Sequence, residues 1–197
     1  MNLARKKVAA EVIVTDKEYL RKTIHILTVL VIPFAVLSSV RAAIAVLTVL
    51  AIGYTVAEYY RFKGEHVAFI TYLVKACARE RELRGFVLTP LYMLLSVIAL
   101  LGLFALPAAS VGIVAATLGD GMATIVGRLH GRHKLLFSKT IEGSFALFIF
   151  TFLGSLIFVD APIAFAVSLA VMLTELVSGD YDNITVPFVA AILVSFF

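Results

Sequence analysis

An aspartate between two glycines is the first feature of this 197-residue sequence with clear potential for chemistry. Asp120 lies between Gly119 and Gly121, near the end of the apolar run 108–126. A carboxylate at membrane depth is costly, so a functional role is its default interpretation. The glycines allow a helix to kink or unwind and another group to approach its backbone. We predict that Asp120 is a catalytic residue and a metal ligand. The alternative is a helix end where Asp120 reaches water.

The next segment, residues 127–142, is rich in groups that bind phosphate. Arginine offers a planar fork of donors, lysine a mobile point charge, and glycine a backbone whose amides can turn towards an anion. The following helix start adds free amides and a favourable dipole. We interpret 127–142 as a phosphate-binding loop, with ordinary anchoring of membrane helices by positive charge as the alternative. The predicted phosphate-binding residues here are Arg128, Arg132, Lys134, Lys139, Gly143 and Ser144.

A second acidic cluster follows the apolar run 161–178. Mg²⁺ prefers one or two carboxylates together with phosphate oxygens and water. We therefore predict that Asp120 and Asp182 hold Mg²⁺ on a bound nucleotide, and that Asn183 orients the nucleotide or a metal-bound water. Glu175 lies within an apolar stretch, so it must face a partner or a wet cavity.

Basic residues also stand at the entry of the first apolar run. Arg21 and His25 have the i, i+4 spacing that sets both on one face of a helix. His25 is a candidate for orienting a phosphate or shuttling a proton, and interfacial anchoring is its alternative role. Lys22, beside them, is predicted to contact phosphate.

The elements that must position these residues are membrane helices. The chain is 61% hydrophobic and 15% charged, with a mean hydropathy of +1.03, whereas soluble domains are roughly 45–50% apolar. At about 20 residues per crossing, residues 1–197 allow one helical bundle and no separate soluble domain. We predict an all-α membrane bundle of about seven transmembrane helices. The apolar runs are 23–40, 42–60, 88–106, 108–126, 143–159, 161–178 and 184–197.

The placement of charge predicts the orientation of these helices. Of the 17 Lys and Arg residues, all except Arg41 fall before the first run, between the second and third, or between the fourth and fifth. The positive-inside rule then places those segments, and the polar site, in the cytoplasm. Residues 1–22 form a cytoplasmic or interfacial segment, and 61–87 contain an amphipathic interfacial helix, with an extra span as the alternative. Membrane orientation thus explains the net charge of +4, and we expect no nucleic-acid partner.

In order along the chain, four blocks of residues resemble the family of CTP-dependent lipid-alcohol kinases. This family includes dolichol kinase, phytol kinase and the CTP-using diacylglycerol kinase. The resemblance implies transfer of the γ-phosphate of CTP, with Mg²⁺ or another divalent cation, to the hydroxyl of a lipid in the bilayer. The blocks are Arg21–His25, Gly119–Ala123 with the pairs Gly127-Arg128 and Gly131-Arg132, Lys139–Ser144, and Asp182–Pro187.

Phosphoryl transfer depends on alignment and charge stabilisation more than on covalent chemistry. Lys139, Arg128 and Arg132 are expected to clamp the triphosphate. Asp120 or Glu142 is expected to accept the proton of the acceptor hydroxyl, and the sequence does not separate these two roles. The predicted catalytic residues are Asp120, Glu142, Lys139 and His25.

The resemblance leaves the acceptor open. Isoprenoid alcohols such as dolichol, polyprenol, phytol or geranylgeraniol, and diacylglycerol, each present one hydroxyl. The related CDP-diacylglycerol synthases are one alternative, although Lys139–Ser144 looks kinase-like and Asp182 is followed by Asn183 in place of the synthase's arginine. An ion-coupled transporter is the alternative of another class, with Asp120 on an ion path, but no internal repeat of the 119–121 block is found. The oligomeric state, including a dimer, stays open.

Overall fold

The computed structural model describes residues 18–65, 78, 82–135 and 139–197. The predicted all-α fold is confirmed for this part of the chain, in which no β-strand is found. Most of the predicted segment 1–22, and most of the amphipathic helix predicted within 61–87, lie outside the described residues.

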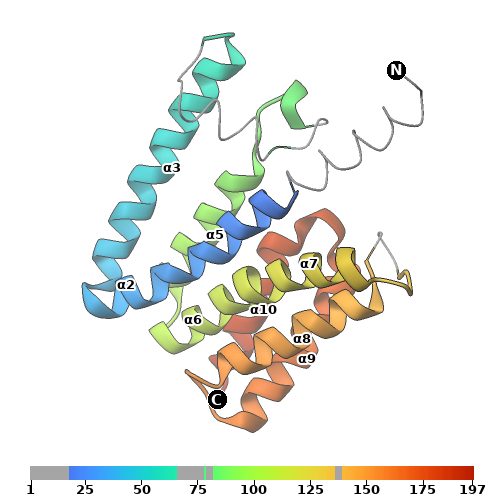
Figure 1. Cartoon of the computed structure of the whole chain (residues 1–197). Coiled ribbons are helices and arrows are strands. Elements are labelled where there is room, and N and C mark those ends of the chain that lie inside the picture. Colours follow the sequence, from blue (N-terminus) through green and yellow to red (C-terminus); the bar gives the residue numbers. More distant parts are fainter. Residues whose placement is uncertain (1–17, 66–77, 79–81, 136–138) are drawn as a thin grey trace, which may run out of the picture.

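From α5 to α10 the helices follow one another with short connections, whereas the path from α3 to α5 is long (Figure 1). Proline stands in the first turn of α5, α6 and α9, where its missing N–H would have no helical partner in any case. The helices are Glu18–Leu37, which contains the 3-10 turn η1 (Thr28–Leu30) and ends as α2 (Val31–Leu37), then α3 (Val40–Phe62), α5 (Thr89–Leu103), α6 (Leu106–Val114), α7 (Asp120–His130), α8 (Ile141–Ser155), α9 (Ala161–Ser178) and α10 (Asp182–Val194). The short turns are η2 (Glu82–Arg84), the π-helical η3 (Ala115–Gly119) between α6 and α7, and η5 (Gly179–Tyr181).

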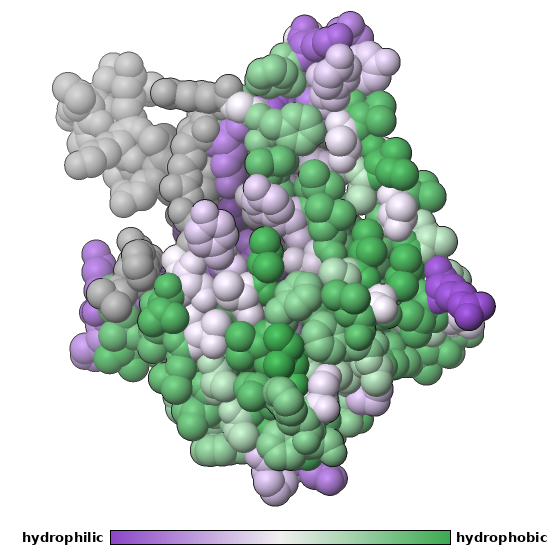
Figure 2. All heavy atoms as spheres, turned by 180° about the vertical axis from the view of Figure 1, so that it is seen from behind, coloured by the Kyte–Doolittle hydropathy of each residue, from purple (hydrophilic) through white to green (hydrophobic). Residues whose placement is uncertain are grey.

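Among the described residues, four helices are long and apolar enough to cross a membrane: Glu18–Leu37, α3, Leu106–His130 and α9. The helices α5, α8 and α10 have only 15, 15 and 13 residues, fewer than the roughly 20 of a typical crossing. Each predicted apolar run contains a helix, but the predicted count of about seven spans is not confirmed. Apolar residues cover most of the face seen in Figure 2, which is compatible with a membrane protein.

The segment Leu106–His130 lies at the centre of the bundle. Its most apolar stretch is 72% buried, against 22–28% for the other three long helices. Within it, Gly112 on α6 allows α10 to approach closely, because a Cβ at this position would lie 2.6 Å from the carbonyl oxygen of Pro187. On the other side, α7 packs along α8, and α8 packs along α9. Asp120 is therefore carried by the most buried of the four long helices that the structure describes.

Candidate active site

A polar cavity of about 650 Å³ lies where the starts of Glu18–Leu37, α5, α8 and α10 meet the ends of α7 and α9. We call this cavity the basin. Its volume falls within the range of small-molecule sites, roughly 300–1,000 Å³. The predicted site residues that line the basin are Lys22, Arg128, Lys139, Gly143, Ser144, Asp182 and Asn183.

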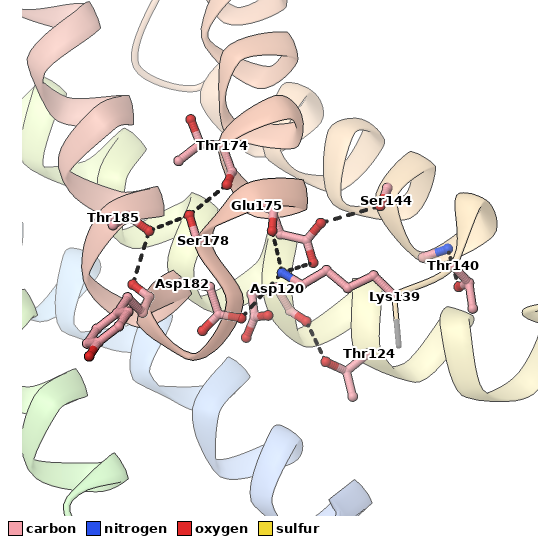
Figure 3. A network of polar contacts seen from close by, with 12 residues as sticks. Asp120, Thr124, Lys139, Thr140, Ser144, Thr174, Glu175, Ser178, Asp182 and Thr185 are labelled. Atoms are coloured by element: carbon pink, nitrogen blue, oxygen red, sulfur yellow. Dashed lines mark hydrogen bonds and ion pairs between the residues drawn. The ribbon is translucent and has the colours of Figure 1, made fainter. Parts of the chain in front are cut away.

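Lys139 lies at the centre of a network of polar contacts in the basin (Figure 3). Its ammonium nitrogen is 2.6 Å from Oε1 of Glu175 and 3.6 Å from Oδ2 of Asp182. It also donates to the backbone carbonyl of Glu175, while the hydroxyl of Ser144 donates to Oε2 of the same residue at 3.3 Å. The side chains of Lys139 and Glu175 are only 13% and 7% exposed. Glu175 was expected to face a partner or a wet cavity, and it has both: the Lys139 ammonium and the basin.

A second charged group lies behind the basin wall. The ammonium of Lys22 donates to Oδ2 of Asp120, and Nε2 of His25 is 3.4 Å from the same oxygen. Nε2 of His25 also lies 2.6 Å from the carbonyl oxygen of Ala116. All three charged or titratable side chains are buried. Residues from two blocks far apart in the sequence therefore form one cluster.

The backbone before Asp120 differs from the expected break at Gly119–Gly121. The helix continues through these glycines, and the irregularity is the wide π-helical turn η3, which ends at Gly119. Such turns are frequently found at functional sites. The acceptor of the His25 hydrogen bond, Ala116, belongs to this turn. The irregular turn and the buried charges thus occupy the same place.

The rim of the basin carries two arginines bridged by a glutamate that the sequence analysis did not single out. Glu18 lies 2.7 Å from the guanidinium of Arg21 and 3.5 Å from that of Arg128. Glu82, also not singled out, accepts a hydrogen bond from Thr89 at 3.1 Å. A signal for Glu18 was present, since it stands three residues before Arg21, a spacing that pairs charges on a helix.

The glycines of the loop have a packing role. A Cβ on Gly143 would lie 2.8 Å from the carbonyl oxygen of Ala123 and 3.3 Å from Cα of Gly127, so glycine brings α8 against α7. Thr140 caps α8: its hydroxyl accepts the N–H of Gly143 at 3.1 Å and its carbonyl accepts the N–H of Ser144 at 2.9 Å. The amides expected to bind phosphate are therefore already bonded within the chain.

Five predicted residues lie outside the lining of the basin as described: Asp120 and His25, which lie behind its wall, and Arg132, Lys134 and Glu142. Glu142 accepts from Nδ1 of His133, whose side chain is 71% exposed, at 2.8 Å. A hydrogen bond from its own backbone N–H, followed by that from His133, lowers the pKa of Glu142 to about 2. Glu142 therefore stays ionised at neutral pH, far from the pKa that suits a general base.

The two predicted metal ligands lie in different places, because Asp182 lines the basin and Asp120 is paired with Lys22 behind its wall. Among the described residues, no group of three or more His, Cys, Asp or Glu side chains is placed to hold an ion. Asp182 lines the basin, and burial, followed by the nearby charge of Asp120, raises the pKa of its carboxyl. Two neighbouring carboxylates attract a cation, and Mg²⁺ takes one or two carboxylates when phosphate oxygens and water complete its shell.

Comparison with known proteins gives one informative similarity. No family model matches the chain, and no solved structure matches it. The chain is 31% identical over 192 residues to a protein of Methanocaldococcus jannaschii named "Uncharacterized protein MJ1137". The alignment covers 91% of this chain and 93% of that protein, so the similarity extends over nearly the whole bundle.

Proposed function

We propose a function from the site itself, because the chain belongs to the family of the Methanocaldococcus jannaschii protein MJ1137, whose name states no activity. The protein is a phosphotransferase that moves the γ-phosphate of CTP to the hydroxyl of a membrane lipid alcohol, with an isoprenoid alcohol as the first candidate. The observation that supports this most is the basin, where Lys22, Arg128 and Lys139 surround a cavity that Asp182 also lines. Cations beside a carboxylate suit a triphosphate with its metal ion.

In this proposal Lys139 and Arg128 bind phosphate oxygens. Lys139 is held by carboxylates from two helices, so its ammonium is already positioned before the nucleotide arrives. Arg128 lies at the rim, where its side chain is 35% exposed and 3.5 Å from Glu18, and its planar fork suits phosphate. Asp182, with Asp120 behind it, would hold the divalent cation, which supplies neutralisation of the phosphate charge when bound.

The transfer itself requires a new bond between the acceptor oxygen and the γ-phosphorus. The bond from that phosphorus to the oxygen bridging the β- and γ-phosphates breaks, and CDP leaves with the electron pair. The hydroxyl proton leaves the acceptor oxygen. Neither of the two carboxylates predicted for this step lines the basin. The lowered pKa of Glu142 makes it a poor base, which favours the cluster around Asp120.

Support for CTP as the donor comes from the four blocks that resemble lipid-alcohol kinases. These blocks meet in the fold, because Lys22, Arg128, Lys139 and Asp182 come one from each block and all line the basin. This convergence favours a catalytic site over an ion path through the bundle.

We further propose that the basin faces the cytoplasm. Arg41 and Lys134 belong to connections at opposite ends of the bundle in this orientation, and both carry exposed side chains suited to labelling. In a Cys77→Ala background, a membrane-impermeant thiol reagent should label Arg41→Cys in intact cells and Lys134→Cys only after lysis. The reverse labelling pattern would refute this orientation.

The activity is tested with purified protein in mixed micelles containing Mg²⁺ and CTP labelled at either the α- or the γ-phosphate. Geranylgeraniol, a polyprenol, phytol, diacylglycerol and phosphatidate are the acceptors. Label from the γ position on an alcohol supports the kinase, and label from the α position on phosphatidate supports a CDP-diacylglycerol synthase instead. Absence of transfer to every lipid would refute both enzymes. The variant Lys139→Met removes the cation at the centre of the basin. Its control is Lys63→Met, which removes one positive charge at an exposed position at the end of α3.

A further inference from the structure

A smaller, mainly apolar cavity of about 150 Å³ adjoins the basin. It lies between the start of the helix Glu18–Leu37, the later part of α3 and the start of α5. We call it the side cavity. Lys22 and Asn183 line both the side cavity and the basin, so the two cavities share a wall. The apolar side chains that line the side cavity include Ile24, Val87, Pro90 and Met93.

One histidine connects the side cavity to the buried charges. His25 lines the side cavity, and its Nε2 lies 2.6 Å from the carbonyl oxygen of Ala116. A carbonyl only accepts hydrogen bonds, so Nε2 carries a proton and Nδ1 of the neutral ring is an acceptor. Among the residues that the structure describes, Nδ1 has no hydrogen-bond partner.

The groups behind His25 fix the orientation of its ring. Oδ2 of Asp120 lies 3.4 Å from Nε2, on the far side of the ring from Nδ1. A carboxylate in this position orients an imidazole. Lys22 contacts the same carboxylate and faces the basin. His25 therefore stands between an apolar cavity and a phosphate-binding one.

The size of the side cavity limits what enters it. A water molecule takes about 30 Å³ of liquid volume, so the cavity holds a hydroxyl and a few carbon atoms. The head of a single-chain alcohol matches this size and apolar lining. A glycerol backbone with two ester groups is larger than this cavity.

We propose that the side cavity is the acceptor subsite and that it takes the hydroxyl end of a single-chain lipid alcohol, with the hydroxyl donating to Nδ1 of His25. This inference rests on the proposed function. During transfer the acceptor oxygen bonds to the γ-phosphorus of CTP, the bond to the β–γ bridging oxygen breaks, and the hydroxyl proton is released to solvent in the basin, while Nδ1 of His25 orients the hydroxyl. CDP leaves with the electron pair.

Two substitutions on one helix test the subsite. Ile24 lines the side cavity and is 38% exposed, whereas Leu27, at 54% exposed, lies outside the lining of both cavities. Ile24→Trp should raise the KM for geranylgeraniol by about tenfold and leave the KM for CTP unchanged. Leu27→Trp should change neither constant. Equal effects of the two substitutions would overturn the subsite.

The acceptor class is tested with the full chain in mixed micelles and γ-labelled CTP. Transfer to geranylgeraniol should exceed transfer to dioleoylglycerol at least tenfold in kcat/KM. Because the hydroxyl loses its orienting partner, His25→Gln should lower kcat about 100-fold with both KM values within about threefold. Equal or greater transfer to dioleoylglycerol would overturn the inference and leave the kinase standing. No transfer to any alcohol would overturn the kinase as well. A thermal unfolding midpoint for His25→Gln near that of the parent protein shows that the loss is chemical, and His25→Asn should repeat it.

Discussion

Replacing Lys139 by methionine removes the cation at the centre of the basin. The carboxylate of Glu175, 2.6 Å away and only 7% exposed, then stays buried without its partner. Removing one member of a buried ion pair lowers the free energy of unfolding by about 3–5 kcal/mol. The hydroxyl of Ser144 still donates to Glu175, which offsets part of the loss. We therefore expect a decrease of about 3 kcal/mol, near the lower end of that range.

A double substitution separates stability from function. In Lys139→Met with Glu175→Gln no buried carboxylate is left unpaired at position 175, so most of the lost free energy of unfolding should return. The phosphate-binding cation is still missing. A hydrogen bond to a charged group contributes about 1.5–3 kcal/mol, so kcat/KM for CTP should stay about 10- to 100-fold below that of the parent protein.

The assay combines reversible unfolding in bicelles with γ-phosphate transfer in mixed micelles. Lys63→Met controls for the loss of one positive charge, because Lys63 is exposed and lies outside the lining of the basin. If the double variant recovered transfer along with stability, Lys139 would be structural only. If Lys139→Met unfolded like the parent protein, the interpretation of the ion pair as buried and stabilising would be wrong.

Three further substitutions give distinct outcomes. Arg128→Gln should raise the KM for CTP about tenfold, as measured by steady-state kinetics. The free energy of unfolding should change by less than about 1 kcal/mol in thermal unfolding, because this side chain is partly exposed. Glu142→Gln should keep kcat within about threefold at pH 7, and a 100-fold loss would instead restore Glu142 as the base. Because the pKa of Glu142 is lowered to about 2, any stabilisation by this carboxylate is present above its usual pKa of 4.5 and is lost as pH falls towards 2. Gly143→Ala should lower the free energy of unfolding by about 1–3 kcal/mol, because the new Cβ meets backbone atoms. The control Gly53→Ala, whose Cβ has nothing within 4 Å, should be neutral or stabilising. Equal unfolding midpoints of the two variants would contradict the close packing of α7 and α8.

The existence and place of the helices were predictable from hydropathy. Each apolar run contains a helix, because many apolar residues contribute to each signal and single exceptions do not alter it. The number of spans was less predictable. Runs such as 88–106 and 184–197 include residues that lie beyond the ends of α5 and α10, since turns at helix ends are also apolar here.

The residue types at the site were predictable, but their pairing was not. Lys22 and Asp120 lie 98 positions apart and meet only because two long helices pack together. Glu82 was missed because it resembles an ordinary charge beside a membrane helix, whereas Glu18 was missed despite its pairing distance from Arg21. The glycines at 127 and 143 suggested a phosphate cradle, yet they serve helix packing, and composition alone does not distinguish these roles.

The central claim is that the basin binds the triphosphate whose terminal phosphate is transferred. It is tested most directly by determining the structure of the protein with Mg²⁺ and a CTP analogue whose β- and γ-phosphates are joined by a methylene group. The account predicts the triphosphate in the basin, within hydrogen-bond distance of Lys139 and Arg128, with the cation on Asp182. An analogue bound outside the basin, in a protein that still transfers the γ-phosphate of CTP, would contradict it.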